Sequence, residues 1–239
     1  MDLFCPISAS SEVLSLPQNV SVTFIGQEKD IPSLKALMGV PYVGMDAEWR
    51  PQMTTFGVNR PAIFQLSSQT HAFLIDMIGL ANSAELDKTL TEIFMQANTI
   101  CVGFSFHSDL SVFSKSLPSM QFFRNFTNYL DLQSYYQTIS DQKQLGLAKV
   151  ADQVLKKAIC KGEQMSNWEK RPLRNSQRHY AALDAFCLIP ILLEAAKNFA
   201  AKDGVSVEDH LRKHVKSFDI NAKPEKPVKT KGKGQSKAD

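Results

Sequence analysis

Apolar positions along the chain predict two kinds of element, in an order typical of a mixed α/β domain. Short runs of apolar and β-branched residues predict strands, and apolar positions that recur every three or four residues predict helices. Strands are predicted at 20–25, 41–47, 62–68, 71–77, 99–103 and around 129–132. Helical spacing occurs at 31–38, 84–96, 108–117 and 176–201. Strands that follow one another so closely predict a meander, and we expect a mixed sheet with helices on both sides.

One globular domain is the simplest organisation for this chain. Of its 239 residues 44% are hydrophobic, which is enough to build one sizeable core. We expect a folded domain over 20–205, an N-terminal extension at 1–19 and a C-terminal helical extension at 206–221. The segment 222–239 is rich in lysine, proline and glycine. It is predicted to be disordered because it has almost no apolar side chain to bury.

The positive charge of the chain is concentrated in that last segment. Six lysines against Glu225 and Asp239 give residues 221–239 a charge of +4, and since the whole chain carries +3, residues 1–220 carry −1. The basic character therefore says little about the domain. The tail is a flexible linker by default, with a nuclear localisation signal or a loose phosphate tether as alternatives.

Several absences favour an intracellular protein, cytoplasmic or nuclear. The N-terminus has neither the basic nor the apolar region of a signal peptide. No apolar stretch approaches the roughly 18 residues of a membrane span. The four cysteines are far apart, so we expect reduced thiols with neither a zinc site nor a disulfide framework.

Three acidic residues lie where strands and helices would hold them rigidly. Asp46 and Glu48 are two positions apart in the strand YVGMDAEW, so their side chains point to the same face. The polar outer face of a half-buried strand explains them as well as a metal site does. Asp109 lies in the first turn of a predicted helix, where the helix dipole favours a negative charge, so capping is its simpler explanation.

Asp184 is harder to explain without a partner. It falls with Tyr180 and Leu188 on one stripe of the helix at 176–201, so a carboxylate interrupts an apolar face. A buried carboxylate is usually paired with an arginine or bound to a metal. Tyr180 precedes Asp184 by one turn, about 6 Å along the axis. Its hydroxyl can therefore lie next to any group that Asp184 binds.

The four acids need cations if they converge. Like charges about 4 Å apart repel by about 4 kcal/mol at an effective dielectric constant of about 20. Oxygen ligands without histidine or cysteine suit Mg²⁺ or Mn²⁺ better than zinc. Two such ions about 4 Å apart would hold the attacking and leaving oxygens of a phosphoryl displacement.

The segments VGMDAEW, VGFSFHSDLSVF and RPLRNSQRHYAALDA resemble the three motifs of the DEDD superfamily of 3′ to 5′ exonucleases. The ordered set of motifs, spread over residues 20–200, is far more specific than any one of them. The chain is most similar to the tyrosine branch, DEDDy, which includes RNase D, the Werner exonuclease domain and the Mutator-type exonucleases of small-RNA pathways. The resemblance implies the RNase H-like, DnaQ-like α/β fold, in which helices flank a mixed central sheet.

The same resemblance implies a role for each acidic residue. Asp46, Glu48 and Asp184 would ligate one Mg²⁺ or Mn²⁺ ion. Asp46, with Asp109 through water, would ligate a second ion. Tyr180 would orient or help to deprotonate the attacking water.

Two positions depart from the family's pattern. His179 is an alternative general base, because HYAALDA also fits the His-x-x-x-x-Asp form of the histidine branch. The flanking Trp-x-x-Arg-Pro-Leu context belongs to the tyrosine branch and favours Tyr180. Arg174 stands where related members often have threonine or serine as a helix cap, and Asn175 or Ser176 could replace it.

Substrate contacts are predicted at Trp49, Phe106, Lys161 and Arg171. The segment SNWEKRPL at 166–173 resembles the stretch that precedes the last motif in Werner and Mutator-type members. Its basic residues, with the lysines upstream, suit phosphate groups. A solvated helix surface explains them equally well.

The implied function is metal-dependent hydrolysis that removes nucleotides from single-stranded 3′ ends and releases 5′-monophosphates. RNA is favoured over DNA by the similarity to Mutator-type members, and a Werner-type DNA exonuclease is the alternative. A catalytically silent exonuclease-like adaptor for nucleic acid is an alternative of another class. Such domains usually lose acidic residues, whereas all four are present here.

Overall fold

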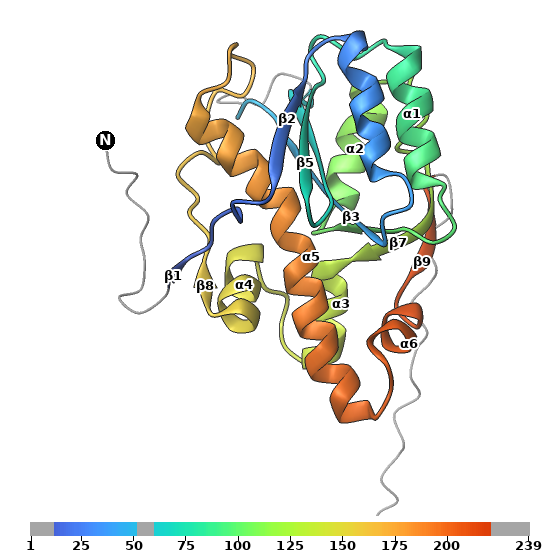
Figure 1. Cartoon of the computed structure of the whole chain (residues 1–239), viewed down its shortest axis with the longest axis vertical. Coiled ribbons are helices and arrows are strands. Elements are labelled where there is room, and N and C mark those ends of the chain that lie inside the picture. The colour runs from blue at the N-terminus through green and yellow to red at the C-terminus, as the bar shows by residue number, and fades with distance from the viewer. Residues whose placement is uncertain (1–11, 52–59, 221–239) are drawn as a thin grey trace, which may run out of the picture.

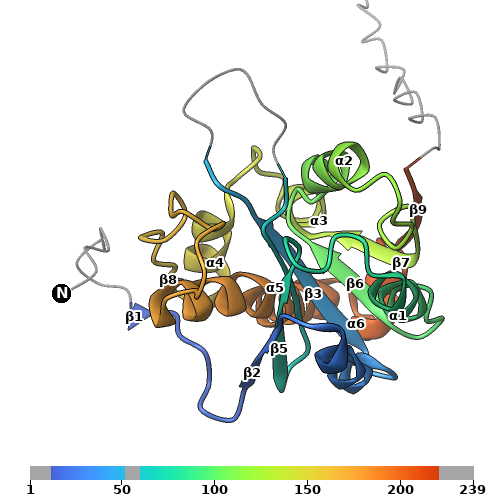
Figure 2. The same cartoon turned by 90° about the horizontal axis from the view of Figure 1, so that it is seen from above.

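The computed structural model of the chain describes residues 12–51 and 60–220. Its central element is a seven-stranded mixed sheet in the order β2-β5-β4-β3-β6-β7-β9. The strands are β2 (Ser21–Ile25), β3 (Tyr42–Glu48), β4 (Ile63–Ser67), β5 (His71–Asp76), β6 (Ile100–Gly103), β7 (Asn125–Asp131) and β9 (Lys216–Asp219). A small second sheet pairs β1 (Glu12–Val13) with β8 (Lys157–Ala158) beside α4 (Leu147–Leu155) (Figure 2).

β3 is the middle strand of the seven. It forms the predicted meander with β4 and β5, both pairs being antiparallel. On its other side it pairs in parallel with β6, and β6 pairs in parallel with β7. β2 pairs in parallel with β5 rather than with β3. Asp46 therefore lies opposite Gln65 of β4, deep inside the sheet.

Helices cover both faces of the sheet, as predicted (Figure 1). The other helices are η1 (Glu28–Leu37), α1 (Ala84–Phe94), α2 (His107–Ser116), α3 (Leu132–Ser140), α5 (Asn175–Asp203) and α6 (Val207–Arg212). One hydrophobic core, which includes Met45, Phe64 and Phe94, lies between the sheet and η1, α1 and α2. A second core, which includes Leu74 and Leu188, lies between the opposite face and α3, α4 and α5.

The long helix α5 crosses the sheet (Figure 1). By length and composition it is apolar enough to span a membrane, a property that the sequence interpretation missed, but 72% of its apolar window is buried inside the domain. Its composition is therefore explained by its place in the core. The expected capping by Asn175 or Ser176 is wrong: Arg174 is the N-cap residue, and its backbone N–H donates to the Gln177 side chain at 3.1 Å.

Two predicted helical segments differ in the structure. η1 is a 3₁₀ helix rather than an α-helix; Pro32 within it lacks the N–H that an α-helical hydrogen bond requires. Residues 206–220, expected to be helical, form the short α6 and then β9, an edge strand that pairs with β7 and packs Phe218 on Tyr129. The segment 222–239, predicted to be disordered, lies outside the described residues. Three cysteines, Cys101, Cys160 and Cys187, are free thiols, and Cys5 lies outside the described residues.

Candidate active site

β3 presents Asp46 and Glu48 on the face of the sheet that α5 covers. Because the two acids are two positions apart, their side chains point the same way, while Met45 and Ala47 belong to the core on the opposite face. Both acids are partly buried. The predicted alternation is therefore present, and the acidic face lies against a helix rather than in open solvent.

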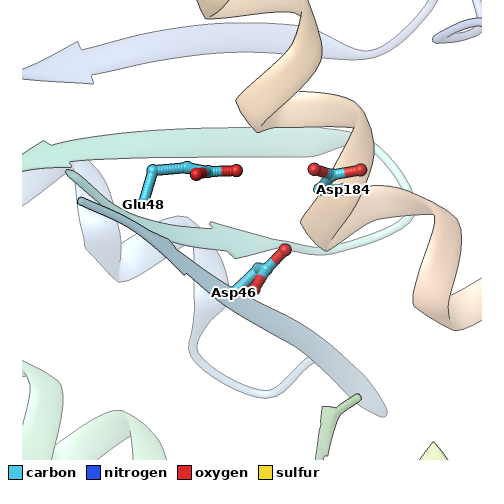
Figure 3. Close-up of side chains that lie close together, drawn as sticks. All are labelled: Asp46, Glu48 and Asp184. Atoms are coloured by element: carbon cyan, nitrogen blue, oxygen red, sulfur yellow. The ribbon is translucent and has the colours of Figure 1, made fainter. Parts of the chain in front are cut away.

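Asp184 reaches the same point from α5. The helix backbone packs directly on β3, since a Cβ atom built on Gly44 would lie 2.0 Å from the carbonyl oxygen of Ala185. Three carboxylate oxygens lie within 4.8 Å of one another, one from each of Asp46, Glu48 and Asp184. Figure 3 shows the three side chains converging between the strand and the helix.

An arginine partner was the alternative explanation for Asp184, which is only 5% exposed. The two arginines of the preceding segment are engaged elsewhere: Arg171 pairs with Asp76, and Arg174 pairs with Glu163. Neither arginine therefore pairs with Asp184, whose partners include the Tyr180 hydroxyl and the nearby charge of Lys161.

Asp109 comes to the site from the first turn of α2. It is almost fully buried and lines the same cavity as the other three acids. Its carboxylate lies outside the group of three but close enough to Asp46 for that charge to act on it. Ser105, with a φ of 54°, makes the turn that leads from β6 into α2.

The four acids line one cavity of about 580 Å³, a volume within the range of small-molecule sites. The acids come from a strand and two helices, so the site draws on segments far apart in the sequence. The other side chains of its walls include Trp49, Phe104, Ser105, Ser108, Leu147, Ala148, Ile159, Lys161, Gln164, Met165 and Tyr180.

Burial raises the pKa of all four carboxyl groups, and their mutual repulsion adds to the effect for three of them. Burial raises the pKa of Asp46 to about 6. Burial and the charges of the other three acids raise the pKa of Glu48 to about 10. Burial and the charge of Asp46 raise the pKa of Asp109 to about 8 and that of Asp184 well above its ordinary value. A bound divalent cation would displace these protons, and an oxygen-only set of this kind fits Mg²⁺ or Mn²⁺.

Tyr180 lines the cavity one turn before Asp184. Burial, the charge of Asp184 and the hydrogen bond that its hydroxyl donates to Asp184 raise the pKa of the phenol. Trp168, which is fully buried, packs against the ring with its centroid 5.9 Å away. His179 is exposed and does not line the cavity. Of the two residues, Tyr180 therefore lies at the acidic cluster and His179 does not.

Trp49 and Lys161, two of the four predicted substrate contacts, line the cavity. The prediction for Phe106 is wrong, because its side chain is 1% exposed and stacks on Phe64 in the core with ring centroids 6.2 Å apart. Gly103 makes room for it: a Cβ atom there would lie 2.5 Å from the Cβ of Phe106.

The prediction for Arg171 is also wrong, because its guanidinium is paired with Asp76 and does not line the cavity of the four acids. It binds Asp76 through two hydrogen bonds of 2.8 and 2.7 Å. It also donates to the carbonyl oxygens of Trp168 and Ala62. Arg171 thereby ties the segment before α5 to the sheet and fixes the backbone of Trp168, the residue behind Tyr180.

Sequence reasoning missed Gln164 and Met165, which also line the cavity. Met165 is 75% exposed, so its side chain is available to a ligand. Both belong to the loop before α5, whose path depends on Glu163, a buried residue that accepts hydrogen bonds from Arg174 and Ser166. No periodic pattern marks such positions, because only the tertiary path of the loop brings them to the site.

Comparison with known proteins finds exonucleases among the relatives of this chain. A family model described as 3′-5′ exonuclease matches residues 25–203. A protein of Aedes aegypti named exonuclease mut-7 homolog is 28% identical over 201 residues, which cover 78% of this chain and 28% of that protein. The chain thus spans little more than a quarter of the length of this relative.

Solved structures share the fold. The Aedes aegypti Nibbler EXO domain matches with a TM-score of 0.72 and 24% identity, over 85% of this chain and 99% of that one. Trypanosoma brucei RNase D, in a complex with RNA U12, matches with a TM-score of 0.60 and 18% identity, over 75% and 62% of the two chains. The predicted RNase H-like α/β fold is confirmed. Because the family model matches most of the chain, the protein belongs to the family of 3′-5′ exonucleases.

Proposed function

We propose that this chain trims the 3′ ends of single-stranded RNA by hydrolysis that requires two divalent cations, Mg²⁺ or Mn²⁺, and releases nucleoside 5′-monophosphates. The observation that carries the proposal is the group of three carboxylates within 4.8 Å, with Asp109 on the same cavity. Lys161 is the one basic side chain among the described residues that line this cavity. Bound cations would therefore balance most of the negative charge.

The acids divide into two ligand sets. Asp46, Glu48 and Asp184 would hold one cation, and Asp46 with Asp109 would hold the other. The separation of Asp109 from the group of three supports this division. When bound, such cations acidify a water molecule and stabilise the charge on the leaving oxygen.

The protein's own groups bind and orient the terminal nucleotide. The Tyr180 hydroxyl, fixed by Asp184 and by the ring of Trp168, orients the attacking water. Lys161 attracts a phosphate group, and Trp49 offers a ring on which a base can stack. In the reaction the water gives up a proton to solvent and its oxygen bonds to phosphorus, the bond from phosphorus to the 3′ oxygen of the preceding nucleotide breaks, and that oxygen takes up a proton.

Two observations support a single-stranded RNA end. A cavity of about 580 Å³ suits a terminal nucleotide, and a duplex would have to fray before its last phosphodiester could reach the acids. The RNase D structure that shares this fold contains RNA U12. Discrimination between RNA and DNA would depend on contacts to the 2′-hydroxyl.

Matched oligonucleotides test the substrate. RNA and DNA of one sequence, and RNA with a single 2′-deoxy substitution at the last or the penultimate nucleotide, are shortened in parallel time courses. We expect RNA to be degraded at least about ten-fold faster, with the loss reproduced by one of the single substitutions, as for a site that binds a substrate hydroxyl. Equal or faster degradation of DNA would favour the Werner-type alternative.

Metal stoichiometry tests the mechanism. Calorimetric titration of the protein with Mn²⁺, in the presence of a nucleoside 5′-monophosphate, should give two ions per chain. The Asp109→Asn variant should lose one of them and retain the other. A single ion in the wild-type protein would contradict the two-cation mechanism.

A further inference from the structure

Gln65 has a buried side chain whose polar atoms are not hydrogen-bonded among the described residues. It lies in the middle of β4 and is 0% exposed. Neither its Oε1 nor its Nε2 atom has a hydrogen-bond partner among the described residues. A carboxamide has two N–H donors and one acceptor oxygen, and buried polar groups in proteins are nearly always paired. A group left unpaired at this depth therefore needs an explanation.

The strand register places Gln65 beside the acidic cluster. β3 and β4 are antiparallel, and Gln65 lies directly opposite Asp46. Residues opposite each other in such a pair project from the same face of the sheet, with Cβ atoms about 5 Å apart. On the other side, on β5, the residue opposite Gln65 is the buried Leu74, which offers no polar group. Asp46 is thus the polar cross-strand neighbour of the amide.

The Asp46 carboxylate has capacity for another donor. Its Oδ1 atom accepts a hydrogen bond from the backbone N–H of Ala47 at 2.9 Å. An ionised carboxylate has about four lone-pair positions, so it can accept from a neighbouring amide and still ligate a cation. Gln65 does not itself line the cavity, and it therefore stands behind the carboxylate rather than beside the substrate.

We propose that Gln65 is a positioning residue for the metal site, whose Nε2 donates a hydrogen bond to the Asp46 carboxylate when that carboxylate holds a divalent cation. The inference rests on the proposed function. Hydrogen bonds of this kind orient metal ligands, and their loss typically lowers metal affinity roughly 10- to 100-fold. A neutral amide suits the position, because a lysine would compete with the cation and a glutamate would add to the repulsion among the acids.

The test is Gln65→Met, which keeps the length of the side chain and removes the amide. Two readouts are independent of catalysis: Mn²⁺ affinity from calorimetric titration, and the thermal midpoint in EDTA and in Mn²⁺. We expect an unchanged or higher midpoint in EDTA, because an unpaired buried amide is replaced by an apolar group. Mn²⁺ affinity should fall roughly 10- to 100-fold, and with it the gain in midpoint on adding the ion. Cleavage should recover at high Mn²⁺ concentration.

Leu66→Met is the matched control, since Leu66 is the next residue of the same strand and is buried in the core on the opposite face. It should bind Mn²⁺ like the wild-type protein. Wild-type affinity in Gln65→Met, or an equal loss in Leu66→Met, would overturn the positioning role while leaving the exonuclease intact. If the wild-type protein neither binds Mn²⁺ nor shortens RNA, the proposed function is overturned, and the role of Gln65, which depends on it, is overturned as well.

Discussion

Gly44 of β3 and Ala185 of α5 are in backbone contact: a Cβ atom on Gly44 would lie 2.0 Å from the carbonyl oxygen of Ala185. The contact requires a residue without a side chain on the strand. Because Gly44 is two residues before Asp46 and Ala185 follows Asp184, this contact also sets the distance between two of the acids. The small residue at position 44 is thus a condition for the site as well as for the packing.

Gly44→Ala should impair both stability and catalysis. The added methyl group cannot be accommodated unless α5 moves away from the sheet, and overpacking of this kind costs about 1–3 kcal/mol in the free energy of unfolding. Urea denaturation and an exonuclease assay measure the two effects. Gly79→Ala is the matched control, since a Cβ atom there would make only ordinary contacts of 3.5 Å or more and its φ is not positive. Wild-type stability of Gly44→Ala would contradict the contact.

Metal binding and stability should depend on pH in opposite directions. In the folded protein the pKa of Asp46 is raised to about 6, that of Asp109 to about 8 and that of Glu48 to about 10, whereas unfolded carboxyl groups titrate near about 4. Their contribution to stability without metal is therefore fully present below about pH 4 and is lost as the pH rises through the folded-state values. The thermal midpoint in EDTA should fall between about pH 5 and about pH 8.

Over the same range Mn²⁺ affinity should rise, because the ion binds only the deprotonated acids. Calorimetric titration at several pH values checks this, and the number of protons released on binding provides a second measure. Affinity that is flat from about pH 5 to about pH 8 would argue against protonated acids in the metal-free protein.

Tyr180→Phe should lower the single-turnover rate about 100-fold or more and His179→Ala should have little effect. The phenylalanine keeps the packing on Trp168 and removes the hydroxyl that bonds Asp184, whereas His179 is exposed away from the cavity. Both variants should bind a labelled oligonucleotide with wild-type affinity. The reverse order of effects would transfer the assignment to His179.

Arg171→Lys should act on stability and Lys161→Met on substrate binding. Lysine keeps the charge at position 171 but cannot form the double hydrogen bond to Asp76, so we expect a loss of about 1–3 kcal/mol in the free energy of unfolding. Any loss of activity should appear in kcat, through the segment that carries Trp168.

Lys161→Met should raise KM and weaken its dependence on salt. A larger rise in KM for Arg171→Lys would restore the original prediction of a substrate contact.

Local geometry predicted from the sequence where three of the acidic side chains point, and the resemblance of the ordered motifs joined them into one site. Strand alternation put Asp46 and Glu48 on one face, and helical spacing put Asp184 on the apolar stripe of α5, where the structure has them. Their convergence depends on the contact of α5 with Gly44. The sequence around Gly44 does not indicate which helix packs against the strand at that residue.

Phe106 and Arg171 were placed wrongly for a related reason. Both lie close in sequence to site residues, and a flexible turn could present either side chain to a ligand. The structure buries one in the phenylalanine core and pairs the other with Asp76, and both partners are distant in sequence. Gln65 was missed because it lies in an apolar strand segment, IFQLS, and its importance is visible only from the register with Asp46.

A time course with 5′-end-labelled RNA tests the central claim most directly. The wild-type protein in Mg²⁺ or Mn²⁺ should produce a ladder of products shortened one nucleotide at a time, and a 3′-end-labelled copy should release its label as a nucleoside 5′-monophosphate at once. EDTA, or the variant Asp184→Asn, should abolish both. Shortening that persists in EDTA, cleavage at internal positions, or the absence of any shortening with either metal would contradict a metal-dependent 3′-5′ exonuclease built on these four acids.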